Sequence, residues 1–163
     1  MPLRLEGSCA CGAISFSVDS HAPYPYQLCY CSICRRTGGG GGYAINLSAD
    51  ARTLKMEGKR FRRTVHAPIA EQGHTSISSA ERHFCGRCGT SLWLFSPEWP
   101  ELLHPMASAI DSELPVPPNR VHLMLGSKAS WVQPDIGPDD QCFDGYPTES
   151  IEDWHRQRGL WMD

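Results

Sequence analysis

The sequence has no long hydrophobic run and no excess of positive charge. Nowhere in its 163 residues do about 18 apolar residues follow one another, which is the length that a transmembrane helix needs. Residues 1–8 contain no apolar stretch of the kind found in signal peptides. The formal net charge of −3 provides no general basic field, which disfavours nonspecific binding to nucleic acid. We therefore expect a cytoplasmic protein without a membrane segment, whose partner is a small soluble molecule.

Cysteine, in contrast, is abundant: the chain has eight, most of them in tight groups. Cytoplasmic thiols stay reduced, so grouped cysteines in that compartment bind metal more often than they form disulfides. A secreted disulfide scaffold is the alternative, since eight is an even number, but the missing signal segment and the Cys-x-Cys spacings argue against it. A chain of this length buries roughly 70% of its unfolded surface, so metal is not needed merely because the protein is small. We expect one domain that spans residues 1–163.

Three cysteines fall within six residues, in the stretch Cys29-Tyr30-Cys31-Ser32-Ile33-Cys34. Their thiols can all point at one centre, and three ligands leave a fourth position open. A structural zinc site is closed by four protein ligands, whereas a catalytic zinc site keeps a position for water or substrate. The triplet therefore predicts a catalytic zinc site.

Two further pairs of cysteines flank the triplet at a distance. They are Cys9-Ala10-Cys11 and Cys85-Gly86-Arg87-Cys88, and the second is a zinc-knuckle pattern whose glycines suit a tight turn. Together the pairs supply the four sulfurs of a closed tetrahedral site, although by spacing alone Cys85 and Cys88 can join either upstream group. An iron-sulfur centre also accepts sulfur-only ligands, but these spacings favour zinc. We expect two zinc ions with different tasks.

Alternating apolar residues, separated by short polar or glycine-bearing segments, predict a mainly β fold. The strand at 91–95 has large side chains on both faces, which predicts a central position, whereas the segment 102–110 has no clear assignment. The one clear helical pattern is the tail at 150–161, where Ser150 and Asp153 form a plausible capping pair. The strand-like segments are 13–18, 43–47, 61–66, 76–84, 91–95 and 121–125.

Three motifs resemble those of the glutathione-dependent formaldehyde-activating enzyme family, which includes centromere protein V. They are Gly7-Ser8-Cys9-Ala10-Cys11-Gly12-Ala13, Cys29-Tyr30-Cys31-Ser32-Ile33-Cys34-Arg35-Arg36 and Phe84-Cys85-Gly86-Arg87-Cys88-Gly89-Thr90. The similarity continues to Phe143-Asp144-Gly145-Tyr146-Pro147, so it covers about residues 4–147 and leaves 148–163 as a helical tail. This resemblance implies an Mss4-like fold of twisted antiparallel sheets around zinc.

The resemblance also implies how the cysteines are divided and what they do. The ligands of a structural zinc correspond to Cys9, Cys11, Cys85 and Cys88, and those of a catalytic zinc to Cys29, Cys31 and Cys34. The implied activity is that of a carbon-sulfur lyase, which makes or breaks the adduct of glutathione with formaldehyde or a related aldehyde. Tyr30 stands where the family commonly has His, which suggests that the substrate differs from the one that named the family. Cys142 matches no ligand position.

Three arginines adjoin the cysteines in sequence, and guanidinium groups bind carboxylates in two-point fashion. Arg35 and Arg36, with Arg87 as a further possibility, are therefore the candidates for holding the carboxylates of a glutathione-like substrate. His83, two residues before Cys85, is the best histidine to support a zinc ligand. The alternative function is a zinc-stabilised binding module without catalysis, in which the basic run at 59–63 docks a protein or nucleic-acid partner.

Overall fold

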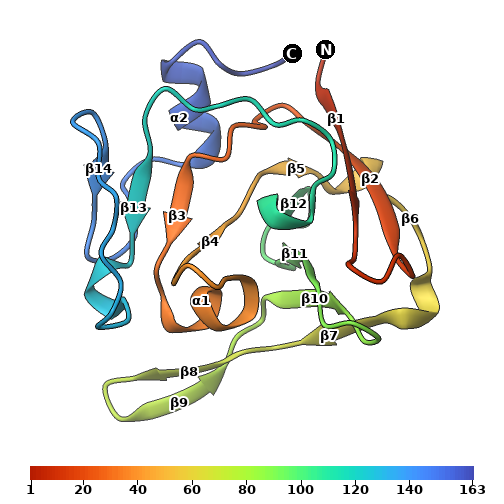
Figure 1. Cartoon of the computed structure of the whole chain (residues 1–163), viewed down its shortest axis with the longest axis horizontal. Helices are drawn as coiled ribbons and strands as arrows, with labels where there is room; N and C mark the ends of the chain where they lie inside the picture. Colours follow the sequence, from red (N-terminus) through yellow and green to blue (C-terminus); the bar gives the residue numbers. More distant parts are fainter.

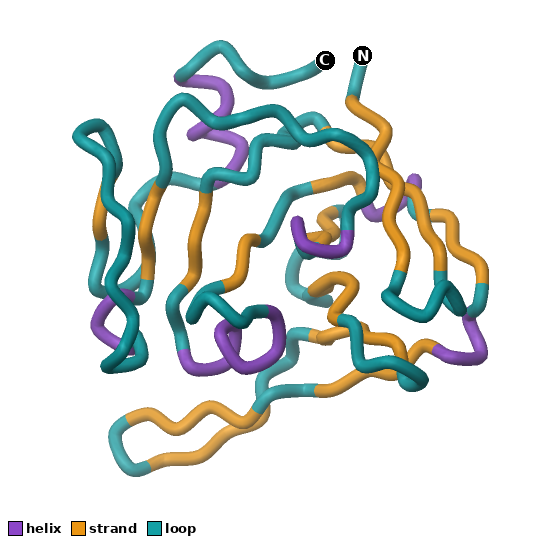
Figure 2. Tube along the Cα trace, viewed as in Figure 1, coloured by secondary structure: helices purple, strands orange, loops and turns teal.

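Short strands joined by turns make up most of the structure. The computed structural model describes all residues from 1 to 163, and the chain forms four sheets and two α-helices (Figures 1 and 2). The prediction of a mainly β fold with a short C-terminal helix is confirmed. None of the helices has the length and apolar character that crossing a bilayer requires.

The first sheet joins the N-terminal hairpin to one later strand. It contains β1 (Leu3–Ser8), β2 (Ser15–Ser20) and β6 (Lys55–Glu57), all antiparallel. Phe16 and Val18 are buried and alternate with more exposed serines, because successive side chains of a strand point to opposite faces. The turn between β1 and β2 carries Cys9 and Cys11. Gly58, with a φ of 83°, follows β6 and lies directly against the Ala13 carbonyl of this turn, where a side chain would clash.

The largest sheet is antiparallel and has β11 (Ser91–Phe95) in its middle, as the large side chains on both faces predicted. Leu92 and Trp93 of this strand are buried. The unassigned segment 102–110 forms a strand that has a neighbour on each side, followed by a single 3-10 turn at Ala107–Ala109. In spatial order the strands are β5 (Ala49–Asp50), β12 (Leu102–Pro105), β11 (Ser91–Phe95), β10 (Glu81–Cys85) and β7 (Arg62–Val65).

The third sheet brings together segments that are far apart in the sequence. Its central pair, β3 (Gln27–Cys29) and β13 (Val121–Leu123), is parallel and sets Cys29 opposite Leu123 and Leu28 opposite His122. β13 is also parallel to β14, so this sheet departs from the antiparallel pattern of the others. Parallel neighbours need a long connection, and here most of the domain lies between them. The strands are β14 (Gln141–Cys142), β13 (Val121–Leu123), β3 (Gln27–Cys29) and β4 (Ala44–Ile45).

Two helices and one hairpin complete the chain. The helix α1 (Ser32–Gly38), which the sequence analysis missed, follows β3 at once and ends among the glycines. The helix α2 (Ile151–Gln157) is shorter than the predicted 150–161, but Ser150 caps it as expected, since its Oγ accepts from the Asp153 N–H at 3.0 Å. The predicted strand at 76–84 is divided between two elements. Its first residues belong to β9 (His74–Ile77) and its last ones to β10, and β9 pairs with β8 (Pro68–Glu71) in a separate hairpin that projects from the body beneath α1 (Figure 1).

One main core holds these sheets together. It comprises 17 buried residues, and Cys9, Cys29, Cys34 and Cys85 are among them. Both predicted metal centres are therefore built onto the core itself.

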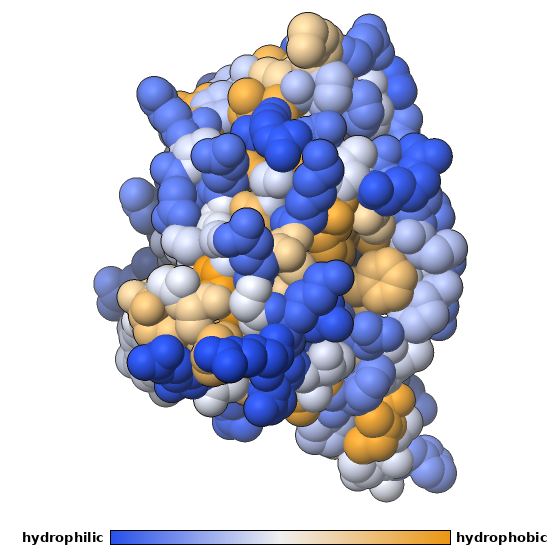
Figure 3. All heavy atoms as spheres, turned by 90° about the vertical axis from the view of Figure 1, so that its right-hand side faces the viewer, coloured by the Kyte–Doolittle hydropathy of each residue, from blue (hydrophilic) through white to orange (hydrophobic).

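On the face that Figure 3 presents, hydrophilic residues cover most of the surface and hydrophobic ones lie between them in small groups.

Candidate metal centres and active site

Four cysteines converge from two turns of different sheets. Cys9 and Cys11 lie between β1 and β2, while Cys85 ends β10 and Cys88 lies in the turn that follows it. The four sulfur atoms all lie within 4.8 Å of one another, with 3.6 Å between Cys9 and Cys11 and 3.8 Å between Cys11 and Cys85. Zinc-sulfur bonds of roughly 2.3 Å place the corners of a tetrahedron about 3.8 Å apart. The separations therefore fit a zinc ion held by four sulfurs.

Neighbouring groups of this four-cysteine cluster stabilise the thiolate form of two of its members, Cys9 and Cys88. The Ile14 N–H donates to Cys9 Sγ at 3.3 Å, and the hydroxyl of Thr90 lies 3.1 Å from Cys88 Sγ. Hydrogen bonds from the hydroxyl and the N–H of Thr90, and from the backbone of Cys11, lower the pKa of Cys88 to about 5. Thiolates are the form that binds metal. The guanidinium of Arg87 lies 5.8 Å from the ring of Phe61.

The second group, the cysteine triplet, is built where β3 passes into α1. Cys29 ends the strand, Cys31 is the N-cap of the helix and Cys34 lies in its first turn, so residues three apart share one side of the helix. The Cys34 N–H donates to Cys31 Sγ at 3.3 Å. All three sulfurs lie within 4.8 Å of one another. Cys29 and Cys34 are buried, whereas Cys31 is partly exposed, which makes the side of Cys31 the accessible one.

The three thiols of the triplet disfavour one another's ionisation. Hydrogen bonds from Cys29 and Cys34 lower the pKa of Cys31 to about 2, and the same contact with Cys31 raises the pKa of Cys29. One thiolate therefore keeps protons on its neighbours, because like charges at such short range disfavour each other. A soft donor set of this kind suits zinc. The triplet, like the four-cysteine cluster, can hold a metal ion.

Two residues beside the triplet were not expected from the sequence. Arg82 of β10 donates from Nη2 to Cys34 Sγ at 3.7 Å and from Nη1 to Thr37 Oγ1 at 3.3 Å. Partial burial, together with the charges of the three cysteines, raises the pKa of the exposed Tyr146, so this phenol is within electrostatic range of the triplet. The only feature of the sequence that could have pointed to Arg82 is that it lies on the predicted strand at 76–84, three residues before Cys85. β10 thus contributes to both cysteine centres.

The sequence-based candidates occupy varied positions. Arg35 has a buried Nε without a hydrogen-bond partner, and Arg36 is exposed on the same helix. His83 is buried, stacks on Trp93 and has its Nε2 3.0 Å from a carboxylate oxygen of Glu81, so its ring is bound within its own strand region.

The basic run at 59–63 makes contacts within the chain. Arg60 lies over the ring of Phe61 at 4.5 Å, and Nη1 of Arg62 approaches Met56 Sδ at 3.4 Å. Arg63 donates to the carbonyls of Arg60 and Arg62. Because these guanidinium groups are bound within the chain, the run is better explained as a solvent-exposed strand edge than as a docking surface.

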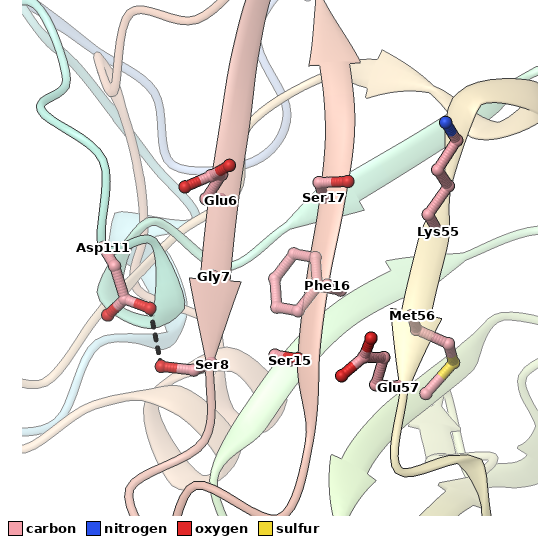
Figure 4. A pocket seen from close by; sticks show the side chains of 10 residues that line it. All are labelled: Glu6, Gly7, Ser8, Ser15, Phe16, Ser17, Lys55, Met56, Glu57 and Asp111. Atoms are coloured by element: carbon pink, nitrogen blue, oxygen red, sulfur yellow. Dashed lines mark hydrogen bonds between the residues drawn. The ribbon is translucent and has the colours of Figure 1, made fainter.

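A shallow pocket of about 570 Å³ lies on one face of the first sheet (Figure 4). It is lined by polar and charged side chains of β1, β2 and β6, and in it Ser8 donates to Asp111 Oδ2 at 2.6 Å. No cysteine lines this pocket. The side chains that line this pocket therefore belong to neither cysteine group.

Fold and site together define a β-rich protein with two cysteine centres for metal, one of four sulfurs and one of three. The model of the glutathione-dependent formaldehyde-activating enzyme family matches residues 4–127, and the chain belongs to this family. The resemblance seen in the three motifs is thereby confirmed, although the family model ends before the segment 128–147.

A protein of Halomonas elongata, named "Putative glutathione-dependent formaldehyde-activating enzyme", is 58% identical over 158 residues, which cover 97% of this chain and 98% of that protein. Because the match covers 97% of this chain, it includes most of the helical tail at 148–163. A crystal structure of a Rhodobacter sphaeroides protein is 24% identical, covers 68% of this chain and 91% of its own, and has a TM-score of 0.49. Family membership supports a glutathione-related activity on formaldehyde.

Proposed function

We propose that this protein is a zinc-dependent carbon-sulfur lyase that makes or cleaves the adduct of glutathione, or a similar thiol, with formaldehyde or a related aldehyde. Family membership supports the thiol and the aldehyde. The observation that carries the zinc chemistry is the unequal pair of cysteine clusters, with four sulfurs in one and three in the other. A closed site and an open site are what a structural and a catalytic ion require.

In this proposal Cys9, Cys11, Cys85 and Cys88 hold the structural zinc, and Cys29, Cys31 and Cys34 hold the catalytic one. Zinc bound by three thiolates supplies an open position at which the pKa of a bound thiol falls. The partly exposed Cys31 marks the side from which the substrate approaches. In the addition, the thiol loses its proton, its sulfur bonds to the carbonyl carbon while the C=O double bond becomes a single bond, and the carbonyl oxygen takes up a proton; cleavage is the reverse.

The neighbours of the triplet suit such a substrate. Arg82 carries a permanent positive charge beside Cys34, where it can pair with a glutathione carboxylate or with the oxygen that gains charge during addition. Tyr146 is exposed near the same cysteines, and its phenol is protonated at neutral pH, so it can donate a hydrogen bond to that oxygen. Arg35 and Arg36, on α1, stay candidates for the second carboxylate.

The central test combines reaction and metal content. Zinc-loaded protein is expected to hold two zinc ions per chain and to accelerate exchange between labelled formaldehyde and its glutathione adduct, followed by NMR at equilibrium. A chelator is expected to remove the zinc of the triplet first, with loss of the acceleration and no change in the far-UV circular dichroism. Zinc, added back, should restore the exchange. If the loaded protein leaves the exchange at its uncatalysed rate, the lyase proposal is wrong.

Arg82→Ala is expected to raise the KM for glutathione by about 10- to 100-fold, equivalent to roughly 1.5 to 3 kcal/mol for a charge-assisted hydrogen bond. Arg82→Lys should recover part of this loss because it keeps the charge without the two-point geometry. Arg60→Ala, in the basic run, is the matched control and should leave the kinetics unchanged. Arg35→Ala and Arg36→Ala, measured in the same way, show whether these arginines also contact the substrate. A normal KM in Arg82→Ala would remove Arg82 from the site.

A further inference from the structure

Tyr30 lies between two cysteines of the triplet, but its side chain is turned away from them. Strand alternation sends neighbouring side chains to opposite faces, and Tyr30 is only 1% exposed. Its hydroxyl lies 2.9 Å from Nδ1 of His122, and its N–H donates to the Leu123 carbonyl at 3.0 Å. Both contacts come from β13, which runs parallel to β3. The residue between Cys29 and Cys31 is therefore bound to β13 both through its backbone N–H and through its side-chain hydroxyl.

The other ring nitrogen of His122 contacts a carboxylate. It is fully buried, and its Nε2 lies 2.9 Å from Oδ2 of Asp140. The side chain of Asp140 is itself only 6% exposed and accepts from the N–H groups of Arg120 at 2.8 Å and Gly137 at 2.9 Å. Three buried polar side chains thus satisfy one another, which matters because a buried polar group without a partner is costly.

The direction of these hydrogen bonds follows from the charge of Asp140. Burial opposes its ionisation, but the bonds from His122, Arg120 and Gly137 outweigh burial and lower the pKa of Asp140 to about 2. An ionised carboxylate only accepts, so Nε2 of His122 carries the hydrogen that it donates to Asp140. The other ring nitrogen of His122, Nδ1, is the one that contacts the hydroxyl of Tyr30.

We propose that Tyr30, His122 and Asp140 are positioning residues for the three-cysteine centre. Their hydrogen bonds fix the peptide on both sides of Tyr30, so that Cys29 and Cys31 present their sulfurs to the metal before it binds. Outer partners that orient metal ligands are typically worth 10- to 100-fold in affinity. The inference rests on the metal site of the proposed function, not on the lyase reaction. It also gives Tyr30, which replaces the family's common His, a role on the side that faces away from the cysteine sulfurs.

The test is chelator competition for zinc in the full-length protein. Tyr30→Phe is expected to weaken the more labile zinc by about 10-fold or more and to leave the tighter one unchanged. With cobalt in place of zinc, the visible absorption of the labile site should change in Tyr30→Phe. Asp140→Asn should act in the same direction, and the double variant should lose less affinity than the two single losses combined, because both changes break one chain. Tyr43→Phe is the matched control, since the Tyr43 ring packs 5.5 Å from that of Tyr30, and its zinc affinities should equal those of the unaltered protein.

Thermal unfolding of each variant separates loss of positioning from loss of fold. Should Tyr30→Phe fail to fold, Asp140→Asn supplies the comparison. Labile-zinc affinity within twofold of the unaltered protein, an equal loss at both sites, or a triplet that never takes up metal would overturn the inference. A variant with weakened zinc in a protein that catalyses no exchange would uphold the positioning role while the lyase proposal fails. Intact zinc affinity in a variant with impaired exchange would overturn the positioning role, while the lyase proposal would stand.

Discussion

Cys88→Ser is expected to yield a chain that is mostly unfolded and insoluble. Cys88 is exposed, so its packing is worth little, and an exposed substitution normally changes stability by only about 0.5 kcal/mol. If Cys88 is a zinc ligand of the four-cysteine cluster, its loss changes the free energy of unfolding by far more than that. Structural zinc contributes roughly 10 to 16 kcal/mol in small peptides, against a net domain stability of about 5 to 15 kcal/mol. The magnitude of the defect therefore decides between a surface thiol and a structural ligand.

The measurement is the soluble yield of Cys88→Ser together with its zinc content and circular dichroism. Cys142→Ser is the matched control, because Cys142 is also exposed but lies on β14, outside both cysteine groups. It should fold with two zinc ions. A Cys88→Ser protein that is as stable as this control would show that the four-cysteine cluster holds no structural ion.

Local features of the sequence carried the predictable part of this protein. Cysteines within three or four residues of one another must lie close in any fold, so their spacing predicted metal centres before the fold was known. The alternation around Phe16 and the two-sided strand at Leu92 and Trp93 predicted β2 and the central β11. The joining of Cys9 and Cys11 with the later pair needed the family resemblance, because a contact over more than 70 residues leaves no local trace.

What the sequence did not predict depends on contacts between distant segments or on unusual local chemistry. The helix α1 has seven residues, too few for a periodic pattern, and its cap is a thiol rather than the usual hydroxyl or carboxylate. Nothing in the sequence around His122 indicated that it is fully buried between Tyr30 and Asp140. Only the parallel pairing of β3 and β13 brings these residues together.

Cys31→Ser is expected to leave a folded protein that has lost one zinc and its activity. Serine is a favoured N-cap, so its hydroxyl can accept from the Cys34 N–H as Cys31 Sγ does, and α1 keeps its first turn. The hydroxyl is a far poorer zinc ligand than a thiolate. The affinity of the triplet should fall by more than the roughly 10- to 100-fold typical of losing an outer partner, and the exchange of formaldehyde with its glutathione adduct should return to the uncatalysed rate.

Metal analysis, circular dichroism and the exchange assay on Cys31→Ser check these three expectations in one preparation. The comparison with Cys88→Ser is decisive, because both variants replace one sulfur by one oxygen and differ only in the cluster that they alter. Opposite outcomes, a folded inactive chain and an unfolded one, follow if four sulfurs close one ion off and three leave the other open. If both variants are folded and retain two zinc ions, neither cysteine is a ligand, and the unequal division of the seven cysteines is wrong.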